Sequence, residues 1–188
     1  MIEGSISVVL PCVMAIHRLN HAVLYVRDVA RSVAFYRDVL GFQVIDDMGP
    51  IPGAAFLRAP GSTNDHDLGL FEVGAQAGPS QAGRGTVGLY HLAWEVDTLD
   101  DLDDLATRLA DTGALVGASD HSTTKSLYGK DPDGIEFEIA WIVPANALDA
   151  AALAGRDRIR PLDISREKTR YGATTPGGIG VSRVAASR

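Results

Sequence analysis

The chain has 188 residues, of which 46% are hydrophobic and 22% are charged, and its formal net charge is −7 at pH 7. This composition predicts a folded globular protein with enough apolar material for one core, and it excludes a chain that is disordered throughout. The acidic balance, without any run of Lys or Arg, excludes a general surface for nucleic acid or an anionic membrane, so small molecules are the expected partners.

Residues 1–15 are expected to form an N-terminal extension. They contain an apolar run at 6–14, but Glu3 precedes it and the basic residues that begin a secretory signal are missing. No stretch is long enough to span a bilayer, and the one cysteine, Cys12, cannot form an internal disulfide. These features together favour a cytoplasmic protein.

The next segment predicts a β-α-β-β-β unit. Alternation along 19–26 indicates a strand with His21 on the face opposite the side chains that pack against a helix. Asp28 can cap that helix, which has an apolar stripe and ends near Gly41. Three further strands are expected at 42–46, 54–58 and 67–73.

The same order then begins again after a Gly-rich connection at 74–88. A strand is expected at 89–96, and His91 occupies the place in it that His21 occupies in the first unit. Thr98 can cap a second amphipathic helix, whose four leucines form its apolar stripe. The acidic residues of this helix suit the helix dipole and do not indicate a metal site. Three more strands are expected at 114–116, 124–128 and 135–143.

The domain organisation follows from this repeat. One domain is expected over 16–143, with modules at 16–74 and 88–143. Beyond it, residues 144–188 lose the pattern, with short helices expected at 146–153 and 165–171 and disorder from 172 to 188.

A hairpin at 128–139 carries the clearest turn signal. Pro132 favours a type I turn, and Gly134 can adopt the left-handed conformation that closes the loop. Counting outward from this turn pairs Tyr128 with Glu138, so a phenol and a carboxylate share one face of the sheet.

Three residues of this pattern suggest a metal site. His21, His91 and Glu138 all lie away from the helix-packed faces, and two histidines with one carboxylate leave open positions on Fe(II) for substrate and oxygen. Taken singly, a histidine in a strand is more often a hydrogen-bonded core or surface residue than a metal ligand.

The opening of the first unit resembles a known superfamily. The segment 20–28, with Ser32, the Phe-Tyr pair at 35–36 and the Leu-Gly-Phe run at 40–42, is similar to the start of vicinal oxygen chelate proteins. These proteins include glyoxalases, bleomycin and fosfomycin resistance proteins and type I extradiol dioxygenases. The resemblance covers 16–143 and implies an α+β fold, in which tandem βαβββ modules form a cupped eight-stranded mixed half-barrel around a metal site.

The second unit most resembles the extradiol ring-cleaving dioxygenases of the catechol 2,3-dioxygenase type. Their signature runs from a histidine through a Leu-Tyr pair, a proline and a glycine to a ligand glutamate. This order is matched by His121, the pair at 127–128, Pro132, Gly134 and Glu138.

The resemblance implies specific roles. The metal ligands would be His21, His91 and Glu138, holding Fe(II), or Mn(II) or another divalent metal in its place. His66 would be the acid–base residue, while His121 and Tyr128 would contact the oxygens of the substrate and of the reaction intermediate. The implied reaction cleaves a small aromatic diol with O2 next to the diol, in a protein that could form a homodimer.

Two other functions are open from the sequence. One is a glyoxalase-type metal-dependent isomerase or lyase, for which Glu72 could be a fourth ligand. The other is a metal-free protein that binds an aromatic ligand or a drug in the same cup.

Overall fold

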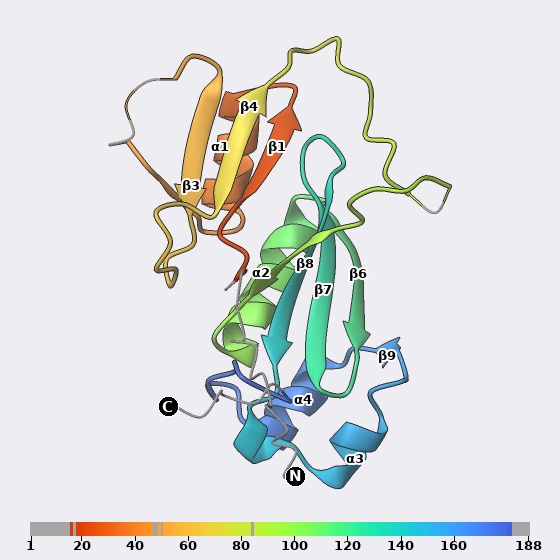
Figure 1. The fold of residues 1–188 in the computed structure, drawn as a ribbon. Coiled ribbons are helices and arrows are strands. Elements are labelled where there is room, and N and C mark those ends of the chain that lie inside the picture. The colour runs from red at the N-terminus through yellow and green to blue at the C-terminus, as the bar shows by residue number, and fades with distance from the viewer. Residues whose placement is uncertain (1–15, 17, 47–48, 50, 84, 182–188) are drawn as a thin grey trace, which may run out of the picture.

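A computed structural model of the chain describes residues 16, 18–46, 49, 51–83 and 85–181 (Figure 1). The expected N-terminal extension, residues 1–15 with Cys12, and the last part of the tail, 182–188, lie outside the described residues. None of the helices among the described residues is both long enough and apolar enough to cross a membrane.

The first module has the predicted β-α-β-β-β order. Its helix begins after Asp28, whose carboxylate accepts a hydrogen bond from the Arg31 N–H at 2.9 Å, as expected for a cap. The sheet order is β1-β4-β3-β2, with β1 parallel to β4. The elements are β1 (Ala22–Val26), α1 (Val29–Asp38), β2 (Gln43–Val44), β3 (Ala54–Arg58) and β4 (Leu68–Glu72).

The second module repeats this order. Thr98 and Asp101 form a reciprocal capping box at the start of its helix, and the four leucines of the predicted stripe are buried. The sheet order is β5-β8-β7-β6-β9, with β5 parallel to β8 and with β9 (Arg160–Pro161) added from the segment after β8. The elements are β5 (Leu92–Glu95), α2 (Leu99–Asp111), β6 (Leu115–Asp120), β7 (Thr124–Lys130) and β8 (Glu136–Ile142).

The predicted hairpin register is confirmed. Tyr128 pairs with Glu138 across β7 and β8, and Gly134 has the left-handed backbone conformation with φ 82°. The Asp131 carboxylate accepts hydrogen bonds from the N–H groups of Asp133 and Ile135 and so closes the turn. This turn fixes which side chains of the two strands stand opposite each other.

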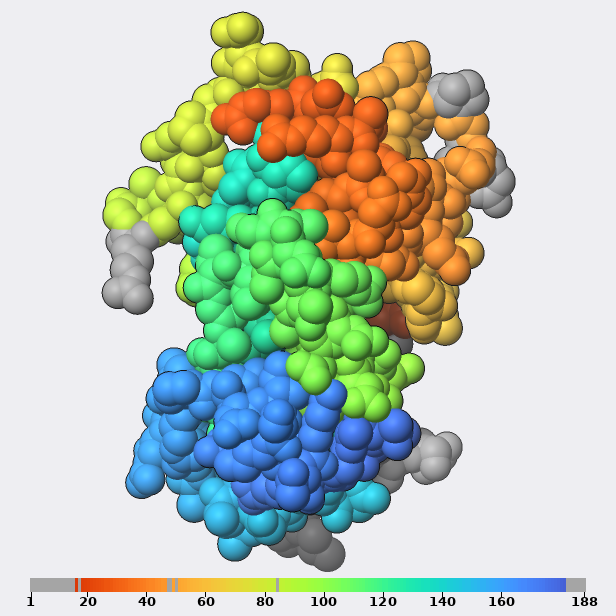
Figure 2. All heavy atoms as spheres, turned by 180° about the vertical axis from the view of Figure 1, so that it is seen from behind, coloured from red at the N-terminus to blue at the C-terminus, as the bar shows by residue number. Residues whose placement is uncertain are grey.

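The two modules pack against each other while keeping separate cores. Phe35 of α1 contacts the core of the second module, and Trp94 of β5 contacts both cores. Arg27 forms a 2.7 Å ion pair with Asp133 of the hairpin, and Figure 2 shows the two modules in direct contact. Over the described residues, the fold is therefore α+β with two mixed sheets of four and five strands and no closed barrel, which confirms the predicted class.

The segment after β8 differs from expectation in two ways. It forms a 3-10 helix at Ala145–Ala147, α3 (Ala150–Ala154) and α4 (Ile164–Tyr171), but it also adds a ninth strand, β9 (Arg160–Pro161), beside β6. Residues 172–181, expected to be disordered, are hydrogen-bonded to the second module, for example from Gly177 N–H to the Asp97 carbonyl at 2.7 Å. Figures 1 and 2 show this C-terminal extension at one end of the second module.

Candidate active site

Two of the three predicted metal ligands lie together on the second module. His91 immediately precedes β5, and Glu138 lies in β8, where it pairs with Ala93. Their Nε2 and Oε2 atoms are 3.1 Å apart, and both side chains are largely buried. An imidazole nitrogen and a carboxylate oxygen are both donors that Fe(II) and Mn(II) accept. These two residues therefore fit part of a divalent-metal site.

His91 also has a buried atom that lacks a partner. Its Nδ1 has no hydrogen bond among the described residues. In most metal-ligating histidines, the ring nitrogen that does not bind the metal donates its N–H to a neighbouring carboxylate, carbonyl or water.

The third predicted ligand, His21, makes its contacts with other residues. His21 immediately precedes β1, as His91 precedes β5, but its Nδ1 faces Asn20 Oδ1 at 2.6 Å. Its ring centroid is 4.5 Å from that of His66. Among the described residues, no three His, Cys, Asp or Glu side chains gather in a way that could hold a metal ion. The predicted triad is thus only partly assembled.

His66, the predicted acid–base residue, is held by the loop between β3 and β4. Its ring packs against Phe56, with the ring centroids 5.0 Å apart. The next residue, Asp67, organises the loop by accepting hydrogen bonds from Ala59 N–H, Ser62 and Asn64. Burial raises the pKa of the Asp67 carboxyl, but these hydrogen bonds outweigh burial and hold the pKa below its usual value. The 4.5 Å distance between the ring centroids of His66 and His21 makes them a histidine pair on the first module.

His121 and Tyr128 contact each other directly. His121 follows β6, Tyr128 lies in β7, and the distance from Nε2 to Oη is 2.9 Å. Burial, followed by the negative charge of Glu138, raises the pKa of the Tyr128 hydroxyl. Tyr128 therefore stays protonated at neutral pH and can donate a hydrogen bond.

These contacts join four predicted residues into one group, here called the second-module cluster: His91, His121, Tyr128 and Glu138. The rings of His91 and Tyr128 have centroids 6.0 Å apart, and Tyr128 stands opposite Glu138 across the hairpin. A pair of ligand type thus lies beside a pair that can exchange protons.

Glu72, considered as a fourth ligand for an isomerase or lyase, is engaged elsewhere. It is exposed at the end of β4, and its Oε2 accepts a hydrogen bond from the Val29 N–H at 3.2 Å. A carboxylate at the N-terminus of α1 is stabilised by the helix dipole.

Sequence reasoning missed one aromatic residue next to the cluster. The Tyr90 ring packs against the His91 ring in a tilted arrangement, with ring centroids 4.6 Å apart, and Tyr90 also lines a cavity of about 1210 Å³ between the modules. None of the six predicted site residues lines that cavity. In the sequence, the only feature that pointed to Tyr90 was its position directly before His91.

A sequence model described as the Glyoxalase/Bleomycin resistance protein/Dioxygenase superfamily matches residues 18–139. The match includes every predicted site residue and ends before the C-terminal extension. A solved structure titled as a glyoxylase/bleomycin resistance protein/dioxygenase domain from Frankia sp. EAN1pec is 26% identical, with a TM-score of 0.55. The alignment covers 67% of this chain and 92% of that one.

Curated relatives include several dioxygenases. A catechol-2,3-dioxygenase of Bacillus subtilis is 32% identical over 121 residues, which are 64% of this chain and 40% of the relative. A biphenyl-2,3-diol 1,2-dioxygenase 3 of Rhodococcus globerulus is 34% identical over 123 residues, which are 65% and 62% of the two chains. This chain therefore aligns with less than two thirds of each relative.

Two further relatives are named for their metal. An iron-dependent extradiol dioxygenase of Rhodococcus jostii is 31% identical, over 74% of this chain and 50% of the relative. A manganese-dependent 2,3-dihydroxybiphenyl 1,2-dioxygenase of Geobacillus genomosp. 3 is 27% identical, over 68% and 38% of the two chains.

Proposed function

We propose a function that proceeds from the family of this chain, which belongs to the glyoxalase/bleomycin resistance protein/dioxygenase superfamily. In this proposal the chain is an extradiol dioxygenase that cleaves a catecholic ring with O2 next to the diol. The observation that carries this proposal is the second-module cluster, in which the His91–Glu138 pair lies beside the hydrogen-bonded pair of His121 and Tyr128. The relatives named as catechol and biphenyl-diol dioxygenases support the same reaction.

The proposed metal is Fe(II), with Mn(II) as the second choice, because relatives are named for both. His91 and Glu138 would hold it, with His21 as the third ligand. His21 is exposed and lines a small pocket together with Leu92, the residue after His91, so the two strand starts are neighbours. The chemistry that such a metal supplies is activation of the diol, by lowering the pKa of its hydroxyls, and of O2.

The chain's own residues would handle hydrogen bonds and protons around the diol. The protonated Tyr128 hydroxyl would donate a hydrogen bond to a substrate oxygen, and His121 would in turn donate a hydrogen bond from its Nε2–H to the Tyr128 oxygen. His66 would take a proton from the diol and return it later, a role that suits an imidazole.

Oxygen uptake tests this proposal. Protein reconstituted anaerobically with Fe(II) and then mixed with a panel of catechols should consume O2, and Glu138→Ala should abolish the uptake together with bound iron. Because Glu72 lies outside the cluster, Glu72→Gln is the matched carboxylate control and should retain both. The proposal fails if no diol gives uptake while a redox-inert divalent metal supports turnover of an isomerase or lyase substrate. It also fails if metal-free protein binds aromatic ligands equally well after Glu138→Ala.

A further inference from the structure

The C-terminal extension, residues 144–181, packs beside the turn that carries His121. Its short strand β9 pairs with the end of β6, where Asp120 is opposite Arg160. Its helix α4 is tied to α2 by Lys168, which contacts Asp100 at 2.8 Å and Asp103 at 2.5 Å. The superfamily model matches residues 18–139 and therefore does not include this extension.

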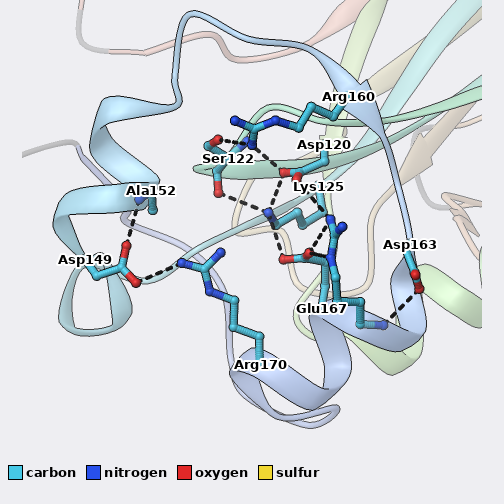
Figure 3. Close-up of polar contacts among 10 residues, drawn as sticks. Asp120, Ser122, Lys125, Asp149, Ala152, Arg160, Asp163, Glu167 and Arg170 are labelled. Atoms are coloured by element: carbon cyan, nitrogen blue, oxygen red, sulfur yellow. Dashed lines mark hydrogen bonds and ion pairs between the residues drawn. The ribbon is translucent and has the colours of Figure 1, made fainter.

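A buried charge network joins this extension to β6 and β7 (Figure 3). Lys125 is fully buried, and its Nζ lies 2.5 Å from Asp120 Oδ1 and 3.0 Å from Glu167 Oε2 of α4. The contact with Asp120 is a hydrogen bond, whereas that with Glu167 is an ion pair without hydrogen-bond geometry. Arg166 adds a second cation, 2.9 Å from Glu167 and 3.4 Å from Asp120.

The charges in this network balance. Two cations face two carboxylates: Lys125 and both carboxylates are buried, whereas the Arg166 side chain is 56% exposed. Pairing of this kind offsets the cost of burying charge. Burial raises the pKa of the Asp120 carboxyl, but the hydrogen bonds from Lys125 and Ser122 N–H and the charges of Lys125 and Arg166 outweigh burial, so the pKa lies below its usual value. Asp120 is therefore a carboxylate at neutral pH.

The network holds both neighbours of His121. Asp120 accepts hydrogen bonds from Lys125 and from Ser122 N–H, and Lys125 also donates to the Ser122 carbonyl at 3.1 Å. Ser122 has a left-handed backbone with φ 67°, which is unfavourable for a residue with a side chain and needs surrounding contacts to persist. His121, between these two anchored residues, has its Nε2 2.9 Å from the Tyr128 hydroxyl.

We propose that Lys125 and Glu167 are positioning residues for His121, through which the C-terminal extension sets the geometry of the His121–Tyr128 pair. Neither residue touches the pair itself. Their effect on catalysis rests on the function proposed above, whereas their effect on the orientation of His121 does not.

The test compares two substitutions on the same helix. Glu167→Gln keeps the shape of the side chain but removes its charge from the network, whereas Lys168→Gln removes the ion pairs between α4 and α2 and leaves the network intact. NMR spectra of the imidazole groups in metal-free protein, assigned with a His121→Gln variant, report on His121 directly. Far-UV circular dichroism establishes that both variants are folded.

We expect the His121 signals to move in Glu167→Gln and to stay in place in Lys168→Gln. With a diol that is turned over, Glu167→Gln should lower kcat about tenfold with little change in KM, because a small displacement of a catalytic group is costly. Unchanged His121 signals in Glu167→Gln, or equal changes in both variants, would overturn the positioning role. An absence of oxygen uptake in the unmodified protein would instead count against the proposed function. The NMR comparison would then still decide whether Glu167 positions His121.

Discussion

The hydroxyl group of Tyr128 makes the hydrogen bond that joins Tyr128 to His121 in the second-module cluster. It contacts His121 Nε2 at 2.9 Å, while the tyrosine ring also faces His91. Tyr128→Phe removes the hydroxyl and keeps the ring, so the substitution separates hydrogen bonding from packing.

Tyr128→Phe should lower kcat for diol cleavage by about 100-fold while leaving the iron content unchanged, because loss of a positioned acid–base group typically has an effect of this order. Oxygen uptake and elemental analysis provide the two measurements. Tyr90→Phe is the matched control. The Tyr90 ring also packs against His91, but Tyr90 is exposed and has no role in the proposed chemistry. A similar loss in both variants would remove the special role of Tyr128.

At the scale of elements, the β7–β8 hairpin sets which residues of the cluster face each other. Its turn requires a left-handed residue at position 134, where a Cβ would meet no other atom within 4 Å. Any cost of replacing this glycine must therefore come from the backbone conformation.

Gly134→Ala should lower the free energy of unfolding by about 1 kcal/mol, the usual cost of a left-handed residue with a side chain. Urea denaturation measures it. Gly78→Ala is the control, because position 78 also has open space but no left-handed backbone, and it should be neutral or slightly stabilising. Equal effects at both positions would show that the turn is not under this constraint.

For the whole molecule, the lowered pKa values of Asp67 and Asp120 predict a loss of stability in acid, whereas the Asp131 carboxyl, whose pKa burial raises, contributes in the opposite direction. The pKa values of Asp67 and Asp120 are lowered in the folded protein, so both carboxylates stabilise it at neutral pH. This contribution is lost as the pH falls below the unfolded value of about 3.9 toward the lower folded values.

Urea denaturation between about pH 6 and about pH 3 should therefore show a falling free energy of unfolding, and Asp67→Asn should reduce the size of that fall. Asp157→Asn, which removes an exposed carboxylate, should leave it unchanged. If Asp67→Asn has the same pH dependence as the unmodified protein, the Asp67 loop does not contribute to acid stability.

Much of the fold was predictable because it depends on local signals. Asp28 and Thr98 as caps, the leucine stripe of α2 and the turn at Gly134 are each readable within a few residues. The Tyr128–Glu138 pairing follows from that turn by counting.

The parts that the sequence alone could not predict depend on contacts between distant segments. Whether His21 reaches His91 depends on how two modules pack across a Gly-rich connection, and no spacing along the chain encodes that packing. Lys125 resembles any lysine in an alternating strand, and only the docking of α4 buries it. The ninth strand was missed because two residues carry too weak a pattern to predict.

The tight packing between Gly155 and Ser122 offers a way to trace the extension through evolution. Gly155 has an ordinary φ of −92°, so any preference for glycine there comes from space, because a Cβ would force the Ser122 hydroxyl to move. A family member with the same extension should keep glycine there together with Lys125 and Glu167. A member without the extension also lacks positions 155 and 167, and it has no reason to bury a lysine in β7. The lysine at position 125 should therefore be present in members that have the extension and absent from members that lack it.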